Sequence, residues 1–116
     1  MCGIVGIISK NNEQLTQIKL ATNALAKRGP DNQQTVSFEQ IALGHARLSI
    51  IDTTEVANQP FTDNSERYTL IFNGEIYNYQ ELKKELLEDG FSFKTNSDTE
   101  VLLYLYIKYK EDCLEK

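Results

Sequence analysis

The chain has 116 residues, of which 41% are hydrophobic and 25% charged, with a formal net charge of -5. This length allows one domain with a modest core, and the composition is typical of a folded, soluble domain. The negative charge argues against nucleic acid or an anionic membrane as a partner. No segment resembles a signal peptide or a membrane span, so we expect a cytoplasmic protein whose two cysteines are free thiols.

The first half of the chain predicts a strand, a helix and two more strands. Residues Cys2–Ile8 are apolar and predict a buried strand. The glycine and proline of segment 28–31 end the helix that follows it. Further strands are expected at Gln34–Phe38 and Ile41–Leu48. The helix face is expected to carry four residues at helical spacing: Leu15, Ile18, Thr22 and Leu25.

The second half predicts a loop over Ile51–Asp63, an apolar strand over Tyr68–Phe72 and two helices. Asn78-x-x-Glu81 and Ser97-x-x-Glu100 both fit the capping box that opens a helix. The first helix should bury Leu82, Leu86 and Leu87 and stop at Gly90. The second should carry Val101, Leu102, Leu105, Tyr106 and Tyr109.

This mixture of elements predicts an α/β or α+β domain with layered sheets. The chain ends after an amphipathic helix and contains few strands, which would leave sheet edges and faces uncovered. We therefore expect residues 1–116 to be part of a longer protein, and uncovered edges could also favour a homodimer.

Cys2 is a candidate nucleophile. Removal of Met1 would leave the thiol and a free α-amine on one residue. An α-amine titrates at roughly pH 8, so it can act as a base near neutrality, and the two groups would form a nucleophile–base pair. The alternative is that this cysteine follows the start codon by accident.

Residues His45 and Arg47 lie late in a predicted strand and on the same face. His45 is the single histidine, which excludes metal sites built from paired histidines, and its expected role is structural, through a hydrogen bond to a neighbouring loop. Arg47 could bind a substrate carboxylate through two parallel hydrogen bonds, although a structural ion pair is favoured from local context alone.

Asn73, Gly74 and Glu75 directly follow the predicted strand that ends at Phe72. Asn-Gly is a strong turn signal, but an asparagine amide and a glycine N–H at a strand end could also stabilise one oxyanion. Asp98 falls in the first turn of a helix, where the helix dipole stabilises an acid whatever its function. Together with Cys2 and Arg47, these residues would suit a zwitterionic amino acid with an amide side chain.

Six segments, in order from Cys2 to about Leu103, also carry a family resemblance. They are Met1-Cys2-Gly3-Ile4-Val5-Gly6, Arg28-Gly29-Pro30-Asp31, Gly44 to Asp52, Gln59-Pro60-Phe61, Asn73-Gly74-Glu75-Ile76-Tyr77-Asn78 and Ser97-Asp98-Thr99-Glu100. The sequence resembles the glutaminase domain of class II glutamine amidotransferases of asparagine synthetase type. The resemblance implies the fold of the N-terminal-nucleophile hydrolases, a four-layer αββα sandwich in the α+β class, incomplete in this chain.

The resemblance also implies residue roles. Cys2 would attack the glutamine side-chain amide, releasing ammonia and leaving a thioester that water hydrolyses to glutamate. Asn73 and Gly74 would form the oxyanion hole. Arg47 would bind the substrate α-carboxylate, and Glu75 and Asp98 the α-ammonium. The backbone of three further residues would line the glutamine pocket: Leu48, Ile50 and Ile51.

In the family a second domain binds ATP, magnesium and aspartate and receives the ammonia. The resemblance implies that residues 1–116 hold only the N-terminal part of the glutamine amidotransferase domain. No cofactor or metal is expected in this part. Retained Met1 would acylate the Cys2 nitrogen, so such material is predicted to be inactive. Three alternatives stay open: a paralogue with another acceptor, a silent interaction module, or an N-terminal-nucleophile amidase acting on a different substrate.

Overall fold

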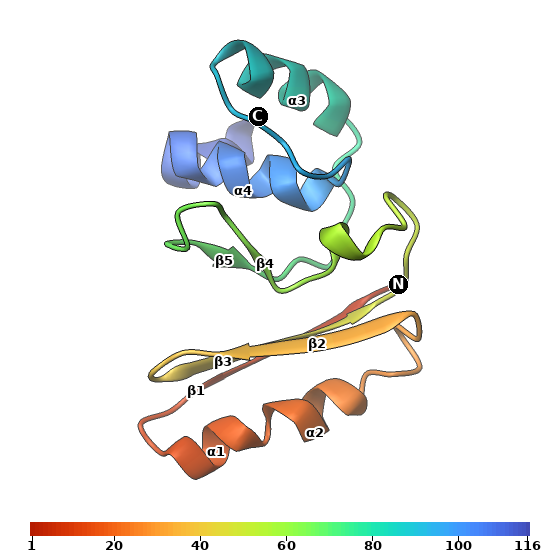
Figure 1. The fold of residues 1–116 in the computed structure, drawn as a ribbon, viewed down its shortest axis with the longest axis vertical. Coiled ribbons are helices and arrows are strands. Elements are labelled where there is room, and N and C mark those ends of the chain that lie inside the picture. Colours follow the sequence, from red (N-terminus) through yellow and green to blue (C-terminus); the bar gives the residue numbers. More distant parts are fainter.

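A computed structural model describes all residues from Met1 to Lys116. Figure 1 shows helices α1 and α2 on one side of a three-stranded sheet, with a two-stranded sheet and helices α3 and α4 on its other side. The structure contains no helix that could span a membrane. The elements are β1 (Gly3–Ile8), α1 (Asn12–Thr16), α2 (Ile18–Asn23), β2 (Asn32–Ser37), β3 (Ile41–Arg47), η1 (Glu55–Ala57), β4 (Phe61–Thr62), β5 (Thr69–Leu70), α3 (Tyr79–Glu88), α4 (Asp98–Tyr109) and η2 (Lys110–Glu115).

The three-stranded sheet is antiparallel, in the order β1-β3-β2. Strand β1 pairs with β3 in a register that sets Gly3 opposite Ala46 and Ile8 opposite Ile41. Three buried residues form the core between this sheet and the first two helices: Leu15, Ile18 and Ala42. The register matters for the site, because it brings the chain start beside the end of β3.

The expected buried strand at the N-terminus is present, but its burial was predicted wrongly. In β1 the side chains alternate, and Ile4 and Ile8 are 45% and 81% exposed. Only Val5 and Ile7 pack against the helical core. The reason is its position, since β1 is an edge strand whose second face no helix covers.

The single helix expected after β1 is two short helices, α1 and α2, that meet at Gln17. The predicted apolar face is confirmed in its buried members: Leu15 and Ile18 are core residues and Thr22 is 2% exposed. The Thr22 hydroxyl donates to the carbonyl of Ile18 at 2.7 Å, so its polar atom is satisfied.

The strand expected at Tyr68–Phe72 is much shorter, because β5 has only two residues and pairs with β4, whose residues Phe61–Thr62 fall in the expected loop. Asp63 organises the hairpin, accepting hydrogen bonds from the backbone of Ser65 and Tyr68 at 2.9 Å each. Burial of Asp63 opposes ionisation, but a bond from the Ser65 hydroxyl, together with the two backbone bonds, outweighs it and lowers the pKa of the Asp63 carboxyl. Hydrogen bonds to the Asp63 side chain therefore hold this hairpin, in which only two residue pairs of β4 and β5 are bonded strand to strand.

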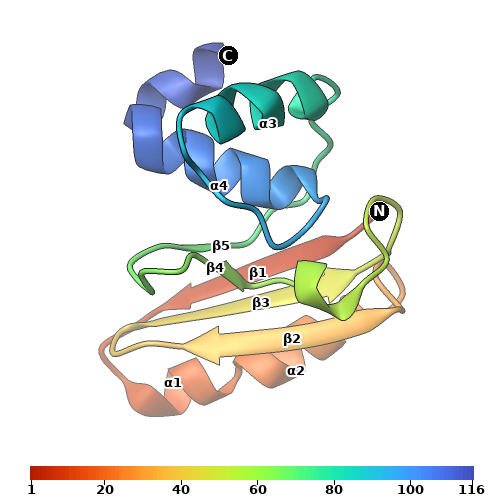
Figure 2. The same cartoon turned by 45° about the horizontal axis from the view of Figure 1, so that its top comes forward.

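Helices α3 and α4 form a second core with the chain end, visible at the top of Figure 2. Its buried members are Leu82, Leu86, Val101, Tyr104, Leu105 and Cys113. Two expectations for α3 were wrong: Leu87 is 50% exposed, and Asn78 makes no capping bond but donates to the carbonyl of Lys116 at 3.1 Å. The expected stop is confirmed, since Gly90 has φ +91, a conformation that favours glycine.

The second capping box is confirmed in one half only. Ser97 caps α4 by accepting from the backbone N–H of Thr99 at 3.1 Å. Glu100 does not reach back to the cap; it is fully buried and its carboxylate accepts from the backbone of Lys94 and Thr95. The domain is thus mixed α/β, with two small cores on either side of its sheets.

Candidate functional site

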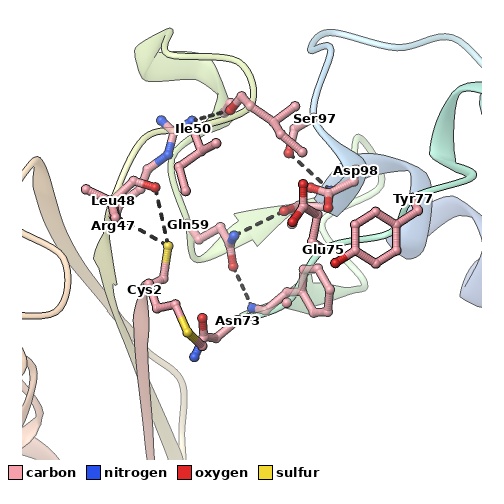
Figure 3. A pocket seen from close by; sticks show the side chains of 16 residues that line it. Cys2, Arg47, Leu48, Ile50, Gln59, Asn73, Glu75, Tyr77, Ser97 and Asp98 are labelled. Atoms are coloured by element: carbon pink, nitrogen blue, oxygen red, sulfur yellow. Dashed lines mark hydrogen bonds between the residues drawn. The ribbon is translucent and has the colours of Figure 1, made fainter.

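One cavity of about 320 Å³ lies where the chain start, the end of β3 and the N-terminus of α4 meet. Its volume is in the range of small-molecule sites. Figure 3 shows side chains from these separate segments pointing into it. Every residue predicted for the site lines it: Cys2, Arg47, Leu48, Ile50, Ile51, Asn73, Gly74, Glu75 and Asp98.

Cys2 is half-buried and its sulfur lies against the backbone of Leu48. The N–H of Leu48 donates to Sγ at 3.3 Å, and Sγ lies 3.6 Å from the Leu48 carbonyl oxygen. On the other side, Nε of Arg28 donates to the Cys2 carbonyl at 3.2 Å. The thiol is therefore held at a fixed place on the cavity wall by two distant segments.

Arg47 is 5% exposed and has no acidic partner, so the structural ion pair favoured from the sequence is absent. Its guanidinium instead binds the loop that follows β3. Nη1 donates to the carbonyl of Thr54 at 2.9 Å and to Oδ1 of Asn58 at 2.6 Å. Nη2 donates to the carbonyl of Asp52 and, at 3.4 Å, to that of Ile51. Arg47 thus folds the loop 51–58 around its charge.

Asp52 closes the same loop from its other side. Its carboxylate accepts from the backbone of Thr54 at 3.0 Å and from the backbone of Asn96 at 2.7 Å. The hydroxyl of Thr54 is the main cause of a lowered pKa for Asp52, with the Asn96 bond acting in the same direction. The loop below the cavity is consequently tied to the segment that leads into α4.

Segment 73–75 has no hydrogen bond within the chain, neither backbone nor side chain. Asn73 and Gly74 therefore do not form the hydrogen-bonded turn that the Asn-Gly pair also indicated. The close packing of Phe72 restricts position 74: a Cβ there would lie 2.6 Å from Cζ of that ring. The free N–H of Gly74 and the amide of Asn73 remain available to a ligand.

Two carboxylates, Glu75 and Asp98, line the cavity without a cationic partner, since the one ion pair of the chain joins Lys108 and Asp89. Asp98 is 5% exposed and its Oδ2 accepts from the backbone N–H of Ile76 at 3.1 Å. Figure 3 places the two acidic side chains near each other. The pair gives this end of the cavity an uncompensated negative charge.

His45 is structural, as its position predicted. It is fully buried, and Nε2 lies 3.2 Å from the carbonyl oxygen of Phe72, so we assign the proton to Nε2. Burial is the main cause of a lowered pKa, and the charge of Arg47 adds to it, against the bond to Phe72. Burial thus favours the neutral form of the ring, and Nδ1 has no partner.

Six residues that line the cavity were not predicted for the site: Ala57, Gln59, Phe72, Tyr77, Ser97 and Thr99. Gln59 is the most informative of them, because it is 6% exposed and both ends of its amide are hydrogen-bonded. A glutamine within an expected loop carries no local signal of burial. Its place in Gln59-Pro60-Phe61, one of the six segments that carry the family resemblance, was the one available indication.

Several known proteins resemble this chain in sequence over most or all of its length. The chain is 45% identical over 121 aligned positions to asparagine synthetase [glutamine-hydrolyzing] 1 of Bacillus subtilis, covering 100% of the chain and 19% of that protein. It is 42% identical to asparagine synthetase [glutamine-hydrolyzing] 3 of the same organism, again with 19% of that protein covered. A third relative, amidase chry2 of Gibberella zeae, is 33% identical over 94% of the chain and 18% of its own length.

Fold and site together define a mixed α/β domain with a small-molecule cavity built beside a thiol at the start of the chain. The family profile described as glutamine amidotransferase domain matches residues 1–116, and the chain belongs to this family. It spans about a fifth of the length of the first two relatives.

Proposed function

We propose that this chain hydrolyses L-glutamine to glutamate and ammonia, as the glutaminase part of an asparagine-synthetase-like amidotransferase. The observation that carries the proposal is the convergence on one cavity of a thiol, an arginine, two unpaired carboxylates and a segment with free hydrogen-bond donors. A zwitterionic amino acid with a side-chain amide matches these groups one by one.

In the proposed reaction, removal of Met1 leaves Cys2 with a free α-amine. The amine takes the thiol proton while Sγ forms a bond to the amide carbon of glutamine. The carbonyl oxygen becomes an oxyanion and accepts hydrogen bonds from the amide of Asn73 and the N–H of Gly74. The C–N bond then breaks, the proton passes from the amine to the leaving nitrogen, and ammonia departs.

The thioester is hydrolysed by the reverse proton path. The α-amine accepts a proton from water as the hydroxide oxygen attacks the thioester carbon. The same oxyanion donors, on Asn73 and Gly74, serve the second tetrahedral intermediate. Expulsion of the Cys2 thiolate, reprotonated by the amine, gives glutamate, so one glutamine and one water become one glutamate and one ammonia.

Substrate orientation follows from charge. Glu75 and Asp98 would bind the α-ammonium, and Arg47 the α-carboxylate, while the backbone of Leu48, Ile50 and Ile51 would line the pocket. All four Nη hydrogens of Arg47 are engaged with the loop, so a carboxylate that binds Nη1 or Nη2 would displace one of these acceptors. The longest of these bonds, to Ile51 at 3.4 Å, is the one whose loss costs least.

We propose that residues 1–116 are the N-terminal part of a glutamine amidotransferase type 2 domain with the αββα fold of N-terminal-nucleophile hydrolases. The stacking of helices, sheet, sheet and helices in Figure 1 supports that fold. The asparagine synthetases among the relatives support a parent protein that passes ammonia to a synthetase domain using ATP and magnesium. The amidase among the relatives favours a second candidate, the same glutaminase with a different acceptor.

The test is alkylation of the full encoded protein by a diazo-ketone analogue of glutamine, followed by intact mass and peptide mapping. We expect loss of Met1 and a single adduct on Cys2, prevented by excess L-glutamine. Cys113, which is 7% exposed in the helical core, is an internal control and stays unmodified. Protein that lacks Met1 yet leaves Cys2 unmodified and releases no glutamate would contradict the proposal.

A further inference from the structure

Gln59 bridges two walls of the cavity. Its Oε1 accepts from the backbone N–H of Phe72 at 2.6 Å, and its Nε2 donates to Oγ1 of Thr99 at 3.1 Å. Figure 3 shows this side chain in the cavity, between the Cys2 side and the Asp98 side. Both ends of one amide are thus committed to segments that carry proposed site residues.

The Phe72 end of the bridge replaces missing sheet hydrogen bonds. Strand β5 ends at Leu70, so the backbone of Phe72 has no partner strand. Side chains supply the two missing bonds: Gln59 takes the N–H, and His45 binds the carbonyl at 3.2 Å. A buried backbone amide left without a partner is costly, so these two side chains hold the peptide directly before Asn73.

The segment after Phe72 depends on this anchorage. Asn73, Gly74 and Glu75 make no hydrogen bonds of their own, and the next fixed point is the N–H of Ile76 on Asp98. The position of the two proposed oxyanion donors is therefore set from the ends of the segment. One of those ends is Gln59.

The bond from Gln59 to Thr99 helps to fix the position of Asp98. Thr99 is 3% exposed and follows Asp98 in the first turn of α4, where its backbone N–H is held by the Ser97 cap. A bond from Gln59 to its hydroxyl ties this turn to the loop below the cavity. The Gln59 bridge and the bond from Ile76 to Asp98 together hold the oxyanion donors at a set distance from Asp98.

We propose that Gln59 is a positioning residue that couples the oxyanion segment to the ammonium-binding turn of α4. The proposal rests on the glutaminase function above and adds to it a residue that contacts neither reacting atom. Its two hydrogen bonds have separable kinetic consequences. The Phe72 bond governs groups that stabilise the transition state and so acts on kcat, whereas the Thr99 bond governs ground-state binding of the α-ammonium and so acts on KM.

The experiment measures glutamine turnover, per site titrated with the diazo-ketone analogue, in the full encoded protein. Gln59→Leu removes both bonds; we expect kcat to fall roughly 10- to 100-fold, as for a displacement near 1 Å, and KM to rise. Thr99→Val removes only the hydroxyl; we expect KM to rise several-fold with kcat nearly unchanged. Thr99→Ser restores the acceptor and should return KM close to the parent value.

The matched control is Thr22→Val, which removes the hydroxyl of a residue that is 2% exposed and lies on the far side of the sheet, outside the cavity. It should alter stability without altering kcat or KM per titrated site. If Gln59→Leu does not fold, the contrast between Thr99→Val and Thr22→Val decides the proposal.

Three outcomes are distinguishable. A KM effect in Thr99→Val that Thr22→Val lacks supports the coupling. Variants that keep parental kcat and KM per titrated site, losing only the number of active sites, overturn it while leaving the glutaminase function intact. A parent protein that neither turns over glutamine nor reacts with the analogue fails the proposed function itself, and the role of Gln59 with it.

Discussion

The sulfur of Cys2 lies 3.3 Å from the backbone nitrogen of Leu48, although 46 residues separate them in sequence. The β1–β3 register produces this contact, because Gly3 pairs with Ala46 and the chain start must then run past the end of β3. Whatever extends from the Cys2 nitrogen consequently enters the cavity, and Met1 is one of the residues that line it.

Retention of Met1 is therefore expected to abolish glutamine turnover. The residue acylates the proposed base and occupies part of the cavity, so both proton transfer and substrate access are lost. A variant that methionine aminopeptidase cannot process, confirmed by intact mass, should show turnover at least roughly 100-fold below processed protein. Comparable turnover in protein verified to retain Met1 would show that the α-amine is not the base.

Arg47→Lys is expected to weaken both the fold and substrate binding. A lysine has no planar fork and cannot hold Thr54, Asn58 and Asp52 at once, so we expect a loss of about 2 kcal/mol in unfolding free energy. KM should rise roughly tenfold, which corresponds to one charged hydrogen bond. Urea unfolding and steady-state kinetics measure the two effects. An unchanged KM at lowered stability would limit Arg47 to shaping the loop.

His45 predicts a decline in stability as the pH falls. Its pKa is lowered from 6.5 by burial, so the unfolded chain binds a proton that the folded chain refuses. The contribution of His45 to the free energy of unfolding is complete above about pH 6.5 and is lost as the pH falls below it. The free energy of unfolding then decreases by up to about 1.4 kcal/mol per pH unit. The carboxylates with lowered pKa, Asp52 and Asp63, act only at more acidic pH.

His45→Gln tests this dependence, because the glutamine amide can still donate to Phe72 but does not titrate. Urea unfolding between pH 7.5 and roughly pH 5 should show a flatter stability profile in the variant than in the parent. Parallel profiles would mean that another group causes the acid sensitivity.

Glu100→Gln is expected to destabilise the helical half without touching the cavity. The Glu100 carboxylate accepts from the backbone of Lys94 and Thr95 and from the Thr95 hydroxyl, at 2.7 to 3.2 Å. A glutamine side chain would place its NH2 group against backbone N–H groups, where no hydrogen bond can form. We therefore expect the free energy of unfolding to fall by about 2 to 3 kcal/mol. Glu88→Gln, at the exposed end of α3, is the control and should cost less than about 0.5 kcal/mol. Equal effects would mean that the buried bonds contribute little.

Burial of Tyr104 raises its pKa to about 12, and the nearby charge of Glu100 acts in the same direction.

Local patterns predicted the elements well where hydrophobic spacing and stop signals agree. Leu15, Ile18 and Thr22 face the core as their spacing indicates, and Gly90 ends α3. The errors concern residues whose partners are distant in sequence. Glu100 was expected to cap its helix but accepts hydrogen bonds from the backbone of the segment before it. Leu87 was expected in the core, but only Leu82 and Leu86 of α3 are buried there and Leu87 is exposed.

The groups available to the site can be read from residue types and their order alone: a thiol at the second position, an arginine, two acids and an Asn-Gly pair after an apolar strand. The chemistry that each of these groups can perform follows from its residue type. The folded chain adds that these groups line one cavity, that Arg47 is already bound to loop carbonyls, and that Gln59 joins Phe72 to Thr99. These facts depend on strand register and on buried polar groups finding partners far along the chain, which no local spacing encodes.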